Sequence, residues 1–229
     1  MQKNTLALLV RCLLMVLGLS LLSLGILFSV KAELGASAWT VFHLGIAKHI
    51  GWTQGRVSQV VGLGIIVISY GMGIKPSLAT LTNMLLVGGV YDLFNATNLV
   101  PTPSTLLLRC LFLVVAVLLT ASGTALYISV KLGAGPRDGL MLALTQRSGW
   151  GIGVVRNSIE LSVLVVGIIL GGPFGFGTVF SALAIGPTLE SCLQLLRSAT
   201  RRWHLQAYLA VAEPRRRQKP VEGVAAGSN

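Results

Sequence analysis

The sequence predicts an all-α, polytopic helical membrane protein with six transmembrane helices, two short helices and two inverted repeats of about 98 residues. Three observations lead to this prediction: a composition poor in charge, six long apolar runs, and a match of the chain with itself. Of the 229 residues, 53% are hydrophobic and 11% are charged, whereas a soluble domain carries about 25% charged residues. This composition excludes an ordinary cytosolic enzyme and a disordered chain.

The apolar runs are long enough to form membrane-spanning helices, which need about 20 predominantly apolar residues. The runs of this length are 6–30, 55–73, 78–99, 104–130, 152–170 and 176–196. They are separated by connectors rich in Gly and Pro, the residues that most strongly interrupt regular structure. We therefore expect six spans.

Two further stretches, 38–50 and 137–148, favour helices but are short. A helix of about twelve residues rises about 18 Å, which is less than the ~30 Å hydrocarbon core of a bilayer. We expect these two helices to be either interfacial or re-entrant.

The chain matches itself without a gap when it is shifted by 98 residues. The matches include Arg-Cys-Leu at 11–13 and 109–111, Leu-Gly-Ala at 34–36 and 132–134, and Gly-Trp at 51–52 and 149–150. Residues 1–100 and 101–197 are then two membrane repeats, each with three spans and one short helix. Because three is odd, the second repeat enters the membrane inverted, as in many secondary transporters. If the short helices spanned as well, the two repeats would be parallel.

The basic residues indicate how the chain is oriented. Seven of its 18 Lys and Arg residues lie between 197 and 219. We interpret 198–229 as a basic interfacial helix and a disordered tail on the cytoplasmic side, beside anionic lipid headgroups. This placement argues against nucleic acid as a partner. With both termini cytoplasmic, the outer loops 100–103 and 171–175 carry no charge, although Lys31 and Lys48 in the outer loop 31–54 fit the rule less well.

A motif in the second repeat resembles a known family. Residues 132–141 read LGAGPRDGLM, Arg156 and Glu160 follow, and residues 171–178 read GGPFGFGT. Over about residues 8–197, the chain resembles the bacterial YczE-type membrane proteins, relatives of the YitT group. The resemblance implies a multi-pass protein of the bacterial cytoplasmic (inner) membrane with no agreed substrate. The first repeat departs from the family pattern because it has Ala38 and Thr40 where Pro and Asp are typical.

The motif also supplies candidate site residues. Gly133, Gly135 and Pro136 precede a short helix that begins with Arg137 and Asp138, and Gly35 is the equivalent of Gly133 in the first repeat. The N-terminus of a helix attracts anions, so an anion or carboxylate site with Arg137 as charge partner is one interpretation. The alternative is a helix cap, in which Asp138 satisfies free N–H groups and Arg137 faces lipid headgroups.

Two further pairs of ionisable residues complete the candidates. Arg156 and Glu160 are four residues apart on the fifth span and therefore share one face. They form either a pair that couples substrate or proton movement, or a structural pair that joins helices. Asp92 and Glu190 are equivalent acids in the two repeats, and they act either as symmetric gates or cation ligands, or as interfacial anchors.

No residue pattern predicts catalysis, a metal site or a cofactor. Cys12, Cys110 and Cys192 lie in apolar runs without a CxxC pair, so we expect neither a disulfide framework nor metal ligands. We do not expect an enzyme. The leading hypothesis is a small secondary permease or exporter for an unknown small-molecule substrate, embedded in the lipid bilayer, with a homodimer as a further option. The alternative is a non-transporting membrane assembly or signalling factor that acts through its basic cytoplasmic tail.

Overall fold

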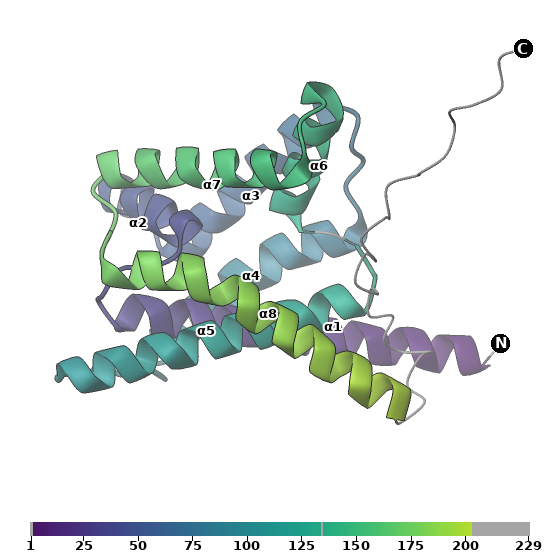
Figure 1. Ribbon diagram of the computed structural model, residues 1–229, viewed down its shortest axis with the longest axis horizontal. Coiled ribbons are helices and arrows are strands. Elements are labelled where there is room, and N and C mark those ends of the chain that lie inside the picture. Colours follow the sequence, from purple (N-terminus) through teal and green to yellow (C-terminus); the bar gives the residue numbers. More distant parts are fainter. Residues whose placement is uncertain (1, 134, 203–229) are drawn as a thin grey trace, which may run out of the picture.

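The computed structural model describes residues 2–133 and 135–202, which form α-helices joined by short loops (Figure 1). The helices are α1 (Gln2–Lys31), α2 (Ala38–Ile50), α3 (Gln54–Gly71), α4 (Leu78–Ala96), α5 (Leu106–Ser129), α6 (Pro136–Ser148), α7 (Ile152–Ile169) and α8 (Phe176–Arg202). The all-helical class is therefore confirmed. The predicted tail beyond Arg202 lies outside the described residues.

Four of these helices are long and apolar enough to cross a membrane. The stretches are Leu6–Lys31, Leu106–Ser129, Ile152–Ile169 and Phe176–Thr200. The runs 55–73 and 78–99 form α3 and α4, of 18 and 19 residues, but these two helices are not among the four. The number of spans stays a prediction.

Local sequence signals set the ends of the short helices. Pro136 opens α6, where its missing N–H removes no helical hydrogen bond. Gly51 and Gly149 end α2 and α6 in the left-handed conformation, with φ of 67° and 71°. These signals explain why both helices stop after 13 residues.

The backbone repeats itself at the same offset as the sequence. Adding 98 to the bounds of α2 and α3 gives the bounds of α6 and α7, and α4 and α8 begin 98 residues apart. The left-handed residues recur as well, because Glu33, Gly35, Gly51 and Gly73 have their counterparts at Lys131, Gly133, Gly149 and Gly171. The two halves of the chain thus share one local structure.

Helices α1 and α5 are equivalent in the two halves and pack against each other (Figure 1). A Cβ atom on Gly123 would lie 2.5 Å from the carbonyl oxygen of Gly18, and one on Gly25 would lie 2.9 Å from that of Ala116. Positions 18 and 116 are equivalent, as are 25 and 123, so one contact is the symmetry mate of the other. The contacts run in opposite order along the two helices, which are therefore antiparallel.

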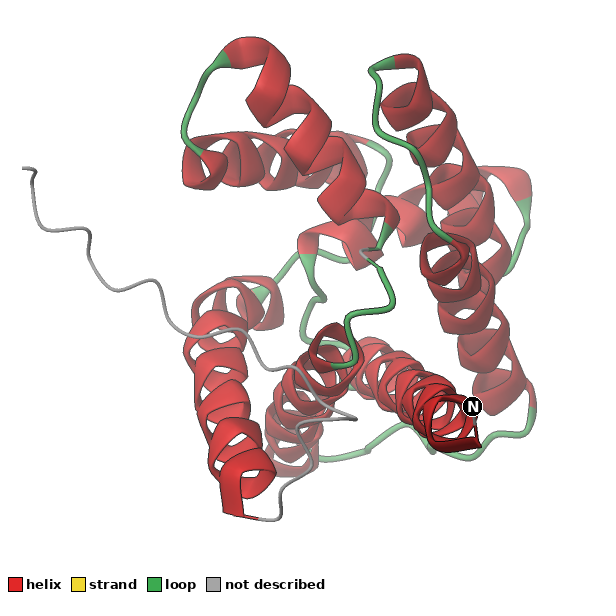
Figure 2. Ribbon diagram, turned by 90° about the vertical axis from the view of Figure 1, so that its right-hand side faces the viewer, coloured by secondary structure: helices red, strands yellow, loops and turns green. Residues whose placement is uncertain are grey.

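The contacts of the other helices also occur in pairs that the repeat relates to each other. Helix α4 packs on α1 while α8 packs on α5, and α2 packs on α7 while α3 packs on α6. The loop before each short helix reaches the other half, because Gly35 lies against Gly175 and Gly133 lies against Ser77. Figure 2 shows these connecting loops near the middle of the molecule, between the helices.

The two halves differ most at one pair of equivalent interfaces. Helix α3 packs closely on α4, where Gly55 meets Gly88 and the Gln59 side chain donates to the Leu85 carbonyl at 3.0 Å. The equivalent helices α7 and α8 diverge from their connecting loop and do not form a packed pair (Figure 1). Consequently, Gly153 and Gly186, the counterparts of Gly55 and Gly88, have no atom within 4 Å of a would-be Cβ.

The close α1–α5 contact leads to a stability prediction. Replacing Gly123 by Ala places a methyl group against the backbone of α1, and such overpacking costs about 1–3 kcal/mol. Gly64 in α3 has open space around it, so its replacement by Ala is a matched control that adds only helix propensity, worth about 1 kcal/mol. We expect thermal unfolding in detergent to show a lower midpoint for Gly123→Ala but not for Gly64→Ala. Equal midpoints for the two variants would contradict the observed packing.

Candidate functional site

Arg137, in the first turn of α6, is the centre of a polar cluster inside the molecule. Its guanidinium lies over the ring of Trp39 in α2, 4.5 Å from the ring centroid, in a cation–π contact. Positions 39 and 137 are equivalent in the two repeats. The contact therefore joins the two short helices at the place where the halves of the chain meet.

Asp138, the next residue, is held by hydrogen bonds from two directions. Its Oδ2 accepts from the backbone N–H of Gly135 at 3.3 Å and from the hydroxyl of Tyr127 at 3.4 Å. The first bond caps the start of α6, and the second ties α6 to α5. The capping role considered for Asp138 is thus present in the structure.

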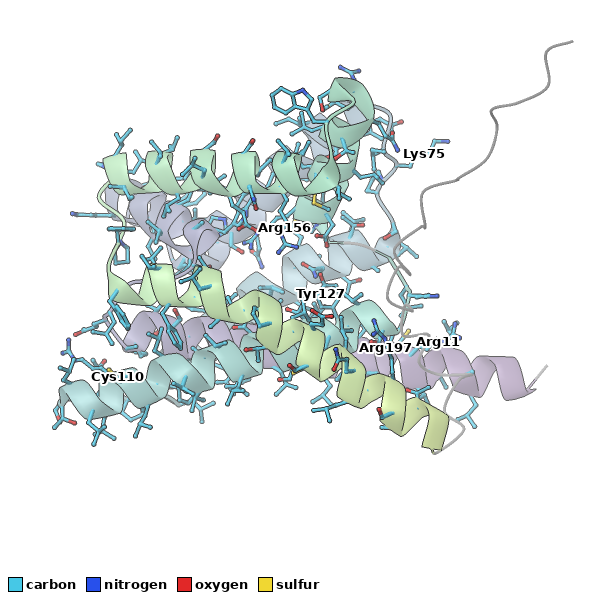
Figure 3. All side chains as sticks on the ribbon, in the orientation of Figure 1. Arg11, Lys75, Cys110, Tyr127, Arg156 and Arg197 are labelled. Carbon is cyan, nitrogen blue, oxygen red and sulfur yellow. The ribbon has the colours of Figure 1, made fainter. Side chains whose placement is uncertain are left out.

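Arg156 and Glu160 form an ion pair along α7. The Arg156 Nε donates to Oε1 of Glu160 at 3.1 Å, and the side chains are 60% and 42% exposed. In Figure 3, Arg156 extends from α7 into the space that separates this helix from the layer of α1 and α5, where Tyr127 lies. Glu160 is close enough for its charge to act on Arg137, as is Arg156 on Tyr127. The pair predicted from spacing therefore faces the same interior as Arg137.

Other groups of the protein surround the Arg137 guanidinium, although the side chain is exposed to solvent. Burial lowers its pKa to about 10, while Asp138, Tyr127 and Glu160 favour the charged form. The guanidinium therefore stays protonated at neutral pH. In the described part of the chain, neither ion pair involves this group.

His43 of α2 is a second polar group beside Trp39. Its side chain is 2% exposed, its ring centroid is 6.2 Å from that of Trp39, and its Nε2 has no hydrogen-bond partner among the described residues. Burial lowers the pKa of His43 well below 6.5, and the charge of Arg137 lowers it further. The imidazole is therefore neutral at pH 7 and can still donate or accept a hydrogen bond at Nε2.

A cavity of about 220 Å³ adjoins the cluster at Asp138, between α3, α4 and α6. Its polar lining comes from Ser69, Lys75, Ser77 and Thr80, together with the backbone of Gly133 and Gly135. Ser69 is 4% exposed, and its hydroxyl has no partner among the described residues. The N-termini of α4 and α6 both border this cavity.

The equivalent acids Asp92 and Glu190 lie in different surroundings. Asp92 accepts from the backbone N–H of Gly55 at 3.0 Å and from the Thr53 hydroxyl, so it holds the start of α3 against α4. Glu190 is exposed and has no hydrogen bond or ion pair within the described residues. The surroundings of the two acids differ because α4 packs on α3, whereas α8 does not pack on α7.

The structure places Arg137, Asp138, Arg156 and Glu160 near one another and adds three aromatic residues. The backbone residues Gly133, Gly135 and Pro136 shape the start of α6, and Gly35 shapes the equivalent loop. Trp39, His43 and Tyr127 were not singled out from the sequence. The repeat offset was the available signal for Trp39, because it aligns that residue with Arg137. Among residues 2–133 and 135–202, no three His, Cys, Asp or Glu side chains gather as metal ligands.

Comparison with known proteins places the chain among membrane proteins without an assigned activity. It is 36% identical over 191 residues to the uncharacterized membrane protein YczE of Bacillus subtilis, covering 81% of this chain and 88% of that protein. It is 35% identical over 178 residues to an uncharacterized protein of Haemophilus influenzae, covering 78% and 81%. It is 29% identical to the uncharacterized protein YyaS of Bacillus subtilis, covering 76% and 88%. No solved structure matches the chain.

The matched family covers the whole interior cluster, beginning within α1 and ending within α8. Its description is a family of unknown function, DUF6198, and it extends over residues 9–194. The apolar helices and the membrane-protein relative together identify an integral membrane protein. The chain belongs to the DUF6198 family and is a YczE-type membrane protein.

Proposed function

We propose that this protein is a small secondary permease or exporter that works by alternating access between two inverted repeats. The observation that carries the proposal is the unequal packing of equivalent helices: α3 is closed against α4, whereas α7 is open from α8. In transporters with inverted repeats, the two copies adopt different conformations, and exchanging these conformations converts one access state into the other.

The antiparallel packing of α1 and α5 supports the inverted arrangement. Equivalent helices that cross the same membrane antiparallel have opposite orientations. Three spans in each repeat give α1 and α5 these opposite orientations. In this arrangement α3 and α4 cross the membrane, like their equivalents α7 and α8. The short helices α2 and α6, of 13 residues each, then lie within the bundle as re-entrant elements.

Two equivalent pairs of glycines are the contact points at which the helices close in the two states. Gly55 and Gly88 allow the backbones of α3 and α4 to touch, as small residues do between membrane helices. Gly153 and Gly186 keep the same residue type at the same positions, although nothing touches them in this conformation. In the alternate state, α7 closes on α8 through this second pair, and Glu190 takes the capping role that Asp92 has now.

The predicted orientation assigns this conformation to one side of the membrane. With both termini in the cytoplasm, the first turn of α3 lies at the outer face and the first turn of α7 at the inner face. The closed Gly55–Gly88 contact then seals the outer side, and the gap between α7 and α8 opens inward. The described conformation is therefore the inward-facing state of a multi-pass protein of the bacterial cytoplasmic membrane.

The interior cluster is the substrate site of the permease. Ionisable groups inside a membrane protein are energetically costly and mark substrate or proton pathways. Arg137, Arg156 and Glu160 lie together where the repeats meet, which is the position of the site in inverted-repeat transporters.

Matched cysteine pairs test the exchange. In a background lacking Cys12, Cys110 and Cys192, the pair Gln59→Cys and Leu85→Cys reports closure of α3 on α4. The pair Asn157→Cys and Leu183→Cys occupies the equivalent positions on α7 and α8. We expect both pairs to form disulfides under oxidation in membranes, because each set of helices closes in one of the two states. We also expect either disulfide to stop transport.

A static protein gives a different result. If the 59–85 pair cross-links and the 157–183 pair never does, the repeats do not exchange conformations and the alternating-access proposal is wrong. Reduction of the disulfides in each variant serves as the control for loss of folding, because a folded protein regains transport.

A second test addresses orientation. Lys75 and Pro173 are equivalent residues, 98 positions apart, and both lie exposed in loops. In the same cysteine-free background, we expect Lys75→Cys to react with a membrane-impermeant thiol reagent from the cytoplasmic side and Pro173→Cys from the outer side. Labelling of both cysteines from one side would contradict inverted repeats and remove the main support for the permease.

A further inference from the structure

Arg137 is a cation that belongs to no ion pair among the described residues. Arg137 is charged at neutral pH, its side chain is exposed to solvent, and its guanidinium lies against the face of Trp39. An aromatic face replaces only part of the hydration of a guanidinium, so its remaining N–H donors are available to an anion.

Both carboxylates near Arg137 are already engaged by other groups. Asp138 accepts from Gly135 and Tyr127 and completes the cap of α6. Glu160 is paired with Arg156 at 3.1 Å. Asp138 and Glu160 are thus close enough to favour the charge of Arg137, but neither forms an ion pair with it.

His43 gives an independent indication of a missing ligand. Its Nε2 is buried without a partner beside the same Trp39 ring. Buried polar atoms in native proteins are nearly always hydrogen-bonded, and each exception calls for an explanation. A ligand that reaches both residues would give the Nε2 of His43 a hydrogen-bond partner and the guanidinium of Arg137 a counter-ion.

We propose that this site binds a small soluble oxyanion, with a carboxylate as the favoured group, and that Arg137 is its counter-ion. A guanidinium offers a planar fork of N–H donors that matches the two oxygens of a carboxylate. The neutral His43 supplies one further hydrogen bond at Nε2. This inference rests on the proposed function, since it assigns the substrate class of the permease.

The test uses Trp39 as a reporter in the full-length protein. Replacing Trp52, Trp150 and Trp203 by Phe leaves Trp39 as the single tryptophan. Iodide is an anion that quenches indole fluorescence, and acrylamide is an uncharged quencher. We expect iodide to quench Trp39 with a saturable concentration dependence in neutral detergent, and acetate and inorganic phosphate to compete with it at constant ionic strength.

Two arginine variants separate the specific site from general attraction. Arg137→Met removes the proposed counter-ion, and Arg147→Met removes an exposed charge from the last turn of the same helix. We expect iodide binding to weaken about tenfold in Arg137→Met, the loss typical of one charge-assisted contact, and to be unchanged in Arg147→Met. Acrylamide quenching reports whether either change disturbs the packing around Trp39. Equal effects of the two variants on iodide would overturn the proposal.

The competition measurement does not depend on a variant that folds. If acetate and phosphate fail to compete with iodide in the protein that retains Arg137, no oxyanion site exists there. Nanodiscs identify the source of the anion: if phosphatidylglycerol blocks iodide quenching while acetate and phosphate have no effect, the occupant is a lipid headgroup and the soluble-anion inference is wrong.

The two proposals fail separately. Anion competition without the 157–183 disulfide would leave a binding site in a protein that does not alternate. The disulfide without anion competition would leave a permease for another class of substrate.

Discussion

Backbone contact between α1 and α5 is the constraint on which the remaining architecture depends. In a bilayer, apolar side chains gain little by leaving lipid for a neighbouring helix, so association relies on close packing of small residues. Gly18, Gly25 and Gly123 provide that closeness. Each member of the pair then carries one further long helix, α4 on α1 and α8 on α5. A salt bridge of 2.9 Å between Glu33 and Arg109 adds a link from the loop after α1 to the start of α5.

The interior cluster shows how a membrane protein accommodates charge. Glu160 is paired with Arg156 of its own helix, and Asp138 caps the start of α6 and also accepts from Tyr127 of α5, so both acids find their partners within their own repeat. The guanidinium of Arg137, in contrast, lies against Trp39 of the other repeat. Its environment therefore changes whenever the repeats move relative to each other, whereas the environments of the two acids are set locally.

Much of the local structure was predictable from the sequence. The short helices were expected at 38–50 and 137–148, and they occur at Ala38–Ile50 and Pro136–Ser148. The fifth predicted span, 152–170, corresponds to α7, which ends at Ile169. These predictions succeed because Pro136 and the left-handed glycines 51 and 149 act through their own backbone conformations. The 98-residue repeat of the sequence also recurs in the bounds of the helices.

Long-range contacts were not predictable in the same way. A helix surrounded by lipid and by other helices is apolar on every side, so the sequence does not mark the face that meets a neighbour. For that reason the pairing of α2 with α7, the separation of α7 from α8, and the gathering of His43 and Tyr127 around Arg137 emerged only from the structure. Predicting the Arg156–Glu160 pair succeeded because its four-residue spacing is a property of one helix.

The meeting of Trp39 and Arg137 has a consequence for the origin of the fold. In an assembly of two identical chains, a position on the two-fold axis meets its own copy, so the same contact would join two tryptophans or two arginines. Two guanidinium groups at that distance would repel each other. Fusion of the two copies into one polypeptide removes this restriction, because each copy can then mutate independently. An aromatic ring facing a cation on the axis is therefore an arrangement that a fused gene can reach and a symmetric homodimer cannot.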